Sequence, residues 1–128
     1  MTAPLAAATP LTPSSDVAPL FAYHDLMTPD PAAARRFYGA LLPWALDTRT
    51  VQGFEYTDIR VGGRRFGGIV PLDPAHGIPP HWMNYVQVGD LDATCARATA
   101  AGGTVKVPPH PLPDGEGRFA VLQDPTGA

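Results

Sequence analysis

A sequence pattern occurs twice in the chain, and this repeat constrains the fold more than any single residue. The first copy, Leu20–Trp44, reads LFAYHDLMTPDPAAARRFYGALLPW, and the second, Pro80–Val105, reads PHWMNYVQVGDLDATCARATAAGGTV. Each copy is a short apolar run, then an aspartate (Asp30 or Asp90), then a helix-like stretch. Self-similarity at a fixed offset indicates one supersecondary unit used twice. Two copies are too few for a solenoid, so we expect paired modules with a site between them.

The size and composition of the chain limit the classes of protein it can belong to. Its 128 residues, 45% of them hydrophobic and 16% charged, suit one globular domain with one core. The net charge of −3, without a Lys/Arg run, argues against nucleic acid and anionic membranes as partners. No apolar run reaches the ~18 residues of a membrane span. The single cysteine, Cys95, excludes an internal disulfide and fits a reducing cytoplasm.

Residues 1–19 differ in composition from the rest and consist mainly of Ala, Pro, Thr and Ser. No Lys or Arg precedes Arg35, so the basic start of a signal peptide is missing. We expect a disordered tail, because the segment lacks the large apolar residues that would offset the entropy of ordering. A processed leader or a strand-swapping arm is the alternative. The domain itself is expected over residues 20–128.

Module one, residues 20–71, is predicted to contain a strand, a helix and three further strands. Asp30 is a helix N-cap followed by proline at the first helical position, and Leu42-Pro43 ends the helix. Helical spacing predicts a buried face of Ala33, Phe37, Ala40 and Leu41. The strands are expected at Leu20–Thr28, Trp44–Val51, Phe54–Val61 and Arg65–Val70, with a hairpin turn at Gly62-Gly63.

Module two, residues 80–128, follows a linker over Pro71–Pro80 that contains four prolines. Asp90 is predicted to cap a helix that ends at Gly102-Gly103. The buried face of this helix is expected to be Leu91, Thr94, Cys95 and Ala98. Strands are predicted at Trp82–Val88, Thr104–Val107 and Arg118–Gln123, and Pro108–Gly117 is predicted to be a loop that can hold a short edge strand.

Three motifs in this order resemble the vicinal oxygen chelate superfamily, which includes glyoxalase I, bleomycin-resistance proteins and extradiol dioxygenases. They are D-x-x-A-x-x-x-FY from Asp30, W-x-x-Y-x-x-V-x-D-x-D-A from Trp82, and G-R-F-A-V-L-x-D-P-x-GA from Gly117. The resemblance implies an α+β fold in which two βαβββ modules form a curled mixed sheet around a shared cavity. It also implies a homodimer, since family members commonly pair along their open edges.

The resemblance further implies where a metal would be held. In metal-using members, His, Glu or Gln ligands come from the first and last strands of each module. The first-strand ligand position, seven residues before the capping aspartate, is occupied here by Tyr23 and by Met83. Neither residue suits a divalent ion at a His/Glu site, so no metal and no cofactor are expected. A site recruited from His24 and His81 requires the strand register to differ by one residue.

If Tyr23 faces the cavity, strand alternation predicts which other side chains do so. We expect a small-molecule site with apolar walls and a few polar groups. Asp25 is the sharpest candidate within it, either as a base or as the partner of an arginine. The candidate ligand-binding residues are Tyr23, Asp25, Tyr56, Met83, Tyr85, Gln87 and Arg118.

The leading hypothesis is therefore a cytoplasmic small-molecule binding protein of the glyoxalase or bleomycin-resistance type, without a catalytic metal. The alternative is a metal-dependent lyase, isomerase or dioxygenase of the same superfamily. A non-catalytic accessory subunit is a third class. The sequence assigns no catalytic residue and leaves open whether the protein is an enzyme.

Overall fold

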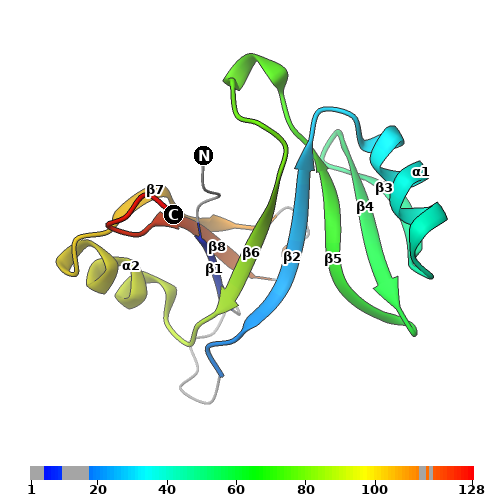
Figure 1. Cartoon of the computed structure of the whole chain (residues 1–128). Helices are drawn as coiled ribbons and strands as arrows, with labels where there is room; N and C mark the ends of the chain where they lie inside the picture. Colours follow the sequence, from blue (N-terminus) through cyan, green and yellow to red (C-terminus); the bar gives the residue numbers. More distant parts are fainter. Residues whose placement is uncertain (1–4, 10–17, 113–114, 116) are drawn as a thin grey trace. The chain divides into compact units, whose positions relative to one another are not determined.

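The structure is a computed structural model that describes residues 5–9, 18–112, 115 and 117–128 (Figure 1). The chain divides into two compact units. The first unit is Tyr23–Trp82, and the second combines Met83–Ala128 with the described residues before Tyr23. Among the described residues, no helix is long and apolar enough to cross a membrane.

The first unit contains one helix on a mixed sheet. Its strands lie in the order β3-β4-β5-β2, with β5 parallel to β2 and antiparallel to β4. In chain order the elements are β2 (Phe21–Thr28), α1 (Pro31–Leu41), β3 (Ala45–Val51), β4 (Phe54–Val61), β5 (Arg64–Pro71) and the short 3-10 helix η1 (Pro74–His76).

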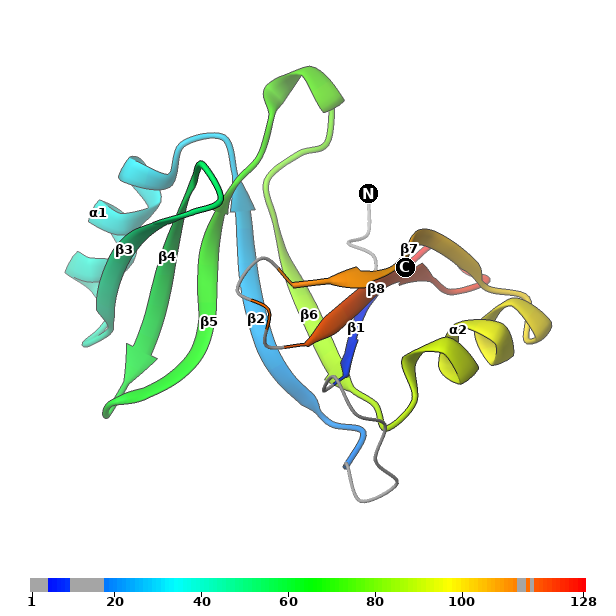
Figure 2. The same ribbon diagram turned by 180° about the vertical axis from the view of Figure 1, so that it is seen from behind.

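The second unit has a similar plan with a different source for one strand. Its strands lie in the order β6-β1-β8-β7, so that β1 lies between β6 and β8 (Figure 2). The elements are β1 (Leu5–Thr9), β6 (His81–Gln87), α2 (Leu91–Ala100), β7 (Thr104–Pro111) and β8 (Arg118–Gln123).

The predicted helix boundaries are confirmed at both repeats. The carboxylate of Asp30 accepts a hydrogen bond from the Ala33 amide at 3.0 Å, and that of Asp90 accepts from the Ala93 amide at 3.0 Å. These bonds satisfy amides that a first helical turn leaves without partners. Helix α2 ends before Gly102, whose φ of 92° is the left-handed conformation that glycine adopts readily.

The predicted buried face is confirmed for α2 and wrong for α1. Leu91 and Cys95 are buried with Ala120 and Leu122 of β8, as expected. On α1, however, Phe37 is 59% exposed and Leu41 61% exposed. The α1 residues that pack on the core of Leu26, Ile59 and Ile69 are Ala34 and Tyr38. The Tyr38 ring also stacks on the Trp44 ring, with the ring centroids 5.5 Å apart, and this contact holds the Tyr38 side of α1 against the core.

Two segments are more regular than the sequence suggested. Strand β7 continues to Pro111 along the edge of the sheet, beyond the predicted Thr104–Val107 and into Pro108–Gly117, the loop in which a short edge strand is allowed for. Strand β1 lies within residues 1–19, where we expected a disordered tail; residues 1–4 and 10–17 of that tail lie outside the described residues. Backbone pairing with β6 and β8 orders Leu5–Thr9, and such pairing does not depend on large apolar side chains.

Candidate ligand-binding site

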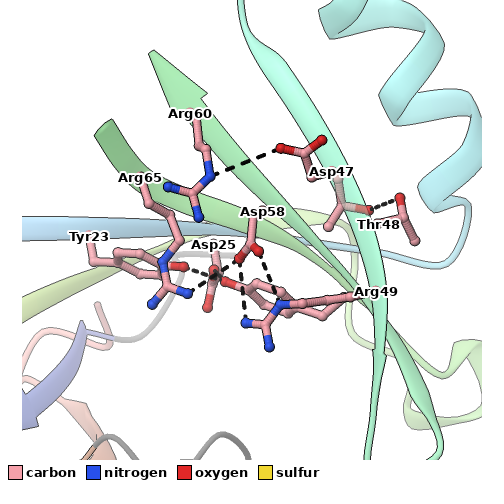
Figure 3. A network of polar contacts seen from close by, with 10 residues as sticks. Tyr23, Asp25, Asp47, Thr48, Arg49, Asp58, Arg60 and Arg65 are labelled. Atoms are coloured by element: carbon pink, nitrogen blue, oxygen red, sulfur yellow. Dashed lines mark hydrogen bonds and ion pairs between the residues drawn. The ribbon is translucent and has the colours of Figure 1, made fainter. Parts of the chain in front are cut away.

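Polar side chains gather on one face of the sheet in the first unit. Register places Asp25, Gly68, Asp58 and Asp47 in one row across four strands. The next row, which contains Leu26 and Ile69, packs against α1. Because side chains alternate along a strand, the row of Asp25 faces away from α1. We call this surface the polar face; it consists of Tyr23, Asp25, Arg49, Tyr56, Asp58 and Arg65, and all of these except Tyr56 are labelled in Figure 3.

Two tyrosines and a buried aspartate form a hydrogen-bonded chain on the polar face. The Tyr56 hydroxyl donates to Oδ1 of Asp25 at 2.8 Å, and it lies 2.5 Å from the Tyr23 hydroxyl. A phenol has one hydrogen to donate, so Tyr23 must be the donor to Tyr56. Asp25 is only 6% exposed, and the chain therefore gives a buried carboxylate a directed donor.

Burial holds both phenols in their protonated form. Burial raises the pKa of Tyr23 from 10.0 to about 12. The pKa of Tyr56 is also raised, first by burial and then by the nearby Asp25 carboxylate. Both hydroxyls are therefore hydrogen-bond donors, rather than oxyanions, at neutral pH.

Two arginines cover this chain and share one carboxylate. Asp58 accepts from Nε of Arg49 at 3.0 Å and from Nη1 of Arg65 at 3.4 Å. The guanidinium of Arg49 lies 5.4 Å from the centre of the Tyr56 ring, and that of Arg65 lies 5.5 Å from the Tyr23 ring. Cation–π contact and ion pairing together fix both guanidiniums in place.

A glycine makes room for this arrangement. A Cβ built on Gly68 would overlap the hydroxyl and ring of Tyr56, so the phenol passes directly over this position of β5. Since Gly68 lies between Asp25 and Asp58 in the row, the missing side chain lets Tyr56 of β4 reach Asp25 of β2.

The structure thus brings together three of the residues proposed from sequence, namely Tyr23, Asp25 and Tyr56. Met83, Tyr85 and Gln87 lie on β6 in the second unit. Tyr85 is in register with Ala6, and Ala6 with Val121, whereas α2 covers the neighbouring row that contains Ala120. By alternation Tyr85 lies on the face of this sheet away from α2.

Arg118 pairs with a carboxylate of helix α2. It forms a two-point ion pair with Asp92 of α2, with contacts of 2.9 and 3.0 Å. Arg118 shares the α2-covered face of β8 with Ala120 and Leu122, two residues away in each case. Its guanidinium therefore lies on the helix side of this sheet.

Sequence reasoning missed Arg49, Asp58 and Arg65. Period-two spacing from Tyr56 marks Asp58, because residues two apart on a strand share a face. No local signal marks the arginines. Arg49 reaches Asp58 from β3 and Arg65 reaches it from β5, and these contacts depend on the pairing of three strands.

The donor set on the polar face does not suit the divalent metal of the superfamily. The ligand position on β2 holds Tyr23, whose hydroxyl is engaged with Tyr56 and whose raised pKa keeps it protonated. His24 lies on the other face, with its ring 6.1 Å from that of Phe66. In the described part of the chain, no three His, Cys, Asp or Glu side chains come together as metal ligands would.

The repeated strand–helix units, in an α+β fold with a mixed sheet, fit the vicinal oxygen chelate class. The chain belongs to the Glyoxalase/Bleomycin resistance protein/Dioxygenase superfamily, whose family model matches residues 20–128.

Three relatives illustrate this membership. "Putative glyoxylase CFP32" of Mycobacterium tuberculosis (strain CDC 1551 / Oshkosh) is 36% identical over 108 residues, which are 81% of this chain and 41% of that protein. "Anthracycline biosynthesis protein DauV" of Streptomyces sp. (strain C5) is 32% identical over 121 residues, 84% of this chain and 44% of that protein. DnrV of Streptomyces peucetius matches to the same extent. The chain spans less than half the length of these curated relatives.

Proposed function

We propose that the chain binds a small organic anion on the polar face and does so without a metal. The observation that carries this proposal is that buried carboxylates lie beneath partly exposed guanidiniums. The carboxylates of Asp25 and Asp58 are buried, whereas the side chains of Arg49 and Arg65 are 39% and 31% exposed. A molecule that approaches from solvent therefore meets two guanidiniums first.

The arginines are pre-organised for such a ligand. Arg49 uses Nε and Nη2 on Asp58, and its planar guanidinium has five N–H donors in all. A carboxylate or enolate oxygen can bind to the remaining donors without the arginine having to reorient, which lowers the entropic cost of binding. The tyrosine rings beneath add flat apolar surface for an aromatic or unsaturated ligand.

Benzoate and benzamide, which share a ring but differ in charge, provide a test on the full chain. We expect benzoate to shift the Nε–H NMR signals of Arg49 and Arg65, and benzamide to leave them in place. Arg49→Gln should weaken benzoate binding by about tenfold, the effect of one charge-assisted hydrogen bond. Arg60→Gln is the matched control, because Arg60 is 40% exposed and pairs with Asp47 instead.

An equal loss of benzoate affinity in Arg60→Gln and Arg49→Gln would contradict the proposal, since it would show that the anion associates non-specifically with exposed arginines. Native mass spectrometry of freshly purified protein adds a second readout. A co-purified molecule should carry an acidic group and should be lost in Arg49→Gln.

The alternative is a metal-dependent lyase, isomerase or dioxygenase of the same superfamily. CFP32 is named a glyoxylase and DauV an anthracycline biosynthesis protein. A metal-dependent activity in this chain would require ligands outside the polar face, so metal content separates the two proposals. We also propose that the protein is a homodimer and is located in the cytoplasm.

A further inference from the structure

The two units share a topology except for the origin of one strand. In the first unit, β5 lies between β2 and β4, parallel to β2 and antiparallel to β4. In the second unit, β6 and β8 correspond to β2 and β4, and the strand between them is β1, parallel to β6 and antiparallel to β8. Strand β5 follows β4 directly along the chain, whereas β1 comes from the N-terminal segment.

We propose that the space between β6 and β8 is a binding site for an extended peptide strand, and that Leu5–Thr9 is its detachable ligand. This inference is independent of the proposed small-molecule function. A strand in this position pairs on both edges, over Leu5–Ala8 with β6 and over Leu5–Thr9 with β8. Main-chain hydrogen bonds on two sides supply affinity that depends little on sequence, as in other cases of strand addition.

The helix above the site sets its preference for side chains. Ala7 is in register with Val86 on one side and with Ala120 on the other. Ala120 is fully buried beneath Leu91 and Cys95 of α2. A peptide strand must therefore be small at the position of Ala7. The segment LAAAT has alanine at its three central positions and meets this condition.

The absence of β1 would leave two open edges in the middle of the second unit. Unpaired edges of β6 and β8 are templates for association with other chains. Strand Leu5–Thr9 thus closes the second unit, and its release exposes a peptide-binding edge.

Proline substitution in the full chain tests the role of β1. Ala7→Pro removes an amide donor from a strand that is paired on both sides. We expect amide hydrogen exchange over Asn84–Gln87 and Ala120–Leu122 to become at least about tenfold faster, because local opening then costs less. Thr12→Pro, which adds a proline outside β1, should change these rates little. Unchanged exchange in Ala7→Pro would overturn the proposal.

A peptide in trans then tests the site itself. A synthetic peptide of residues 1–12 should bind the Ala7→Pro chain and restore slow exchange at Ala120–Leu122. The same peptide carrying Ala7→Trp should bind about tenfold more weakly, because of the bulk at the position in register with Ala120. The unmodified chain should bind neither peptide, since its own strand fills the site. Failure of the native-sequence peptide to bind would refute a detachable strand.

A cysteine pair covers the case in which Ala7→Pro does not fold. In a Cys95→Ala background, Ala7→Cys with Ala120→Cys joins two positions in register. Ala7→Cys with Phe119→Cys is the matched control, because neighbouring strand positions face opposite sides. We expect a disulfide in the first variant and none in the second. No disulfide in either, or equal yields, would place Leu5–Thr9 outside the site.

Discussion

The phenol of Tyr56 lies across Gly68, in the volume that any other side chain at this position would fill. This relationship links three strands, since Tyr56 on β4 passes over β5 to reach Asp25 on β2. The glycine is therefore part of the polar face, although it contributes no polar atom.

Gly68→Ala should destabilise the protein by about 1–3 kcal/mol, the usual range for overpacking. The added methyl group displaces Tyr56 and removes the donor to the buried Asp25 carboxylate. Chemical denaturation measures the change. Gly39→Ala, within helix α1, is the control. The added Cβ would contact Leu46 at 3.7 Å, an ordinary van der Waals distance, so this substitution should stabilise the protein by up to about 1 kcal/mol. Equal effects of the two substitutions would contradict this account.

Alkaline pH should unfold the protein through the buried tyrosines. The folded state raises the pKa of Tyr23 to about 12 from 10.0, so it holds the phenol proton more tightly than the unfolded chain does. This stabilisation is complete below pH 10 and is lost as pH rises toward about 12. Absorbance at the phenolate wavelength reports ionisation of these tyrosines, and circular dichroism reports unfolding. We expect the two signals to change over the same pH range. Ionisation of both near pH 10 in a folded protein would contradict the burial argument.

Purified protein should contain no stoichiometric divalent metal. Tyr23 and Met83 stand at the first-strand ligand positions, and a protonated phenol and a thioether are poor ligands for such an ion. Elemental analysis for Ni, Zn, Fe and Mn, without added metal, provides the measurement. One tightly bound equivalent, together with a fall in melting temperature on chelation, would support the metal-dependent alternative instead.

Sedimentation should give a mass of about twice 13.5 kDa. Phe37 and Leu41 are four residues apart on α1 and both are largely exposed, so they form an apolar surface that a second copy can cover. The pair Phe37→Glu and Leu41→Glu should shift the protein toward monomer. Val61→Glu is the control, because Val61 is an exposed apolar residue on β4 at 44%. A monomer at high micromolar concentration would refute dimerisation.

Local rules account for what could be predicted from the sequence. The capping roles of Asp30 and Asp90 depend on hydrogen bonds within one helical turn, and both are present. The shared face of Tyr23 and Asp25 follows from the two-residue period of a strand, and both contact Tyr56. The buried face of α2 follows in the same way from helical spacing.

The sequence by itself thus determined the repeated strand–helix units, their caps, and which side chains share a face. Only the tertiary structure decided which partners those faces contact. Ala34 and Tyr38, rather than Phe37, pack on the core, and Arg118 forms an ion pair with Asp92. It also decided that Leu5–Thr9 pairs with β6 and β8. The physical reason is that caps and alternation act within a few residues, whereas strand pairing and ion pairs depend on segments distant in the chain.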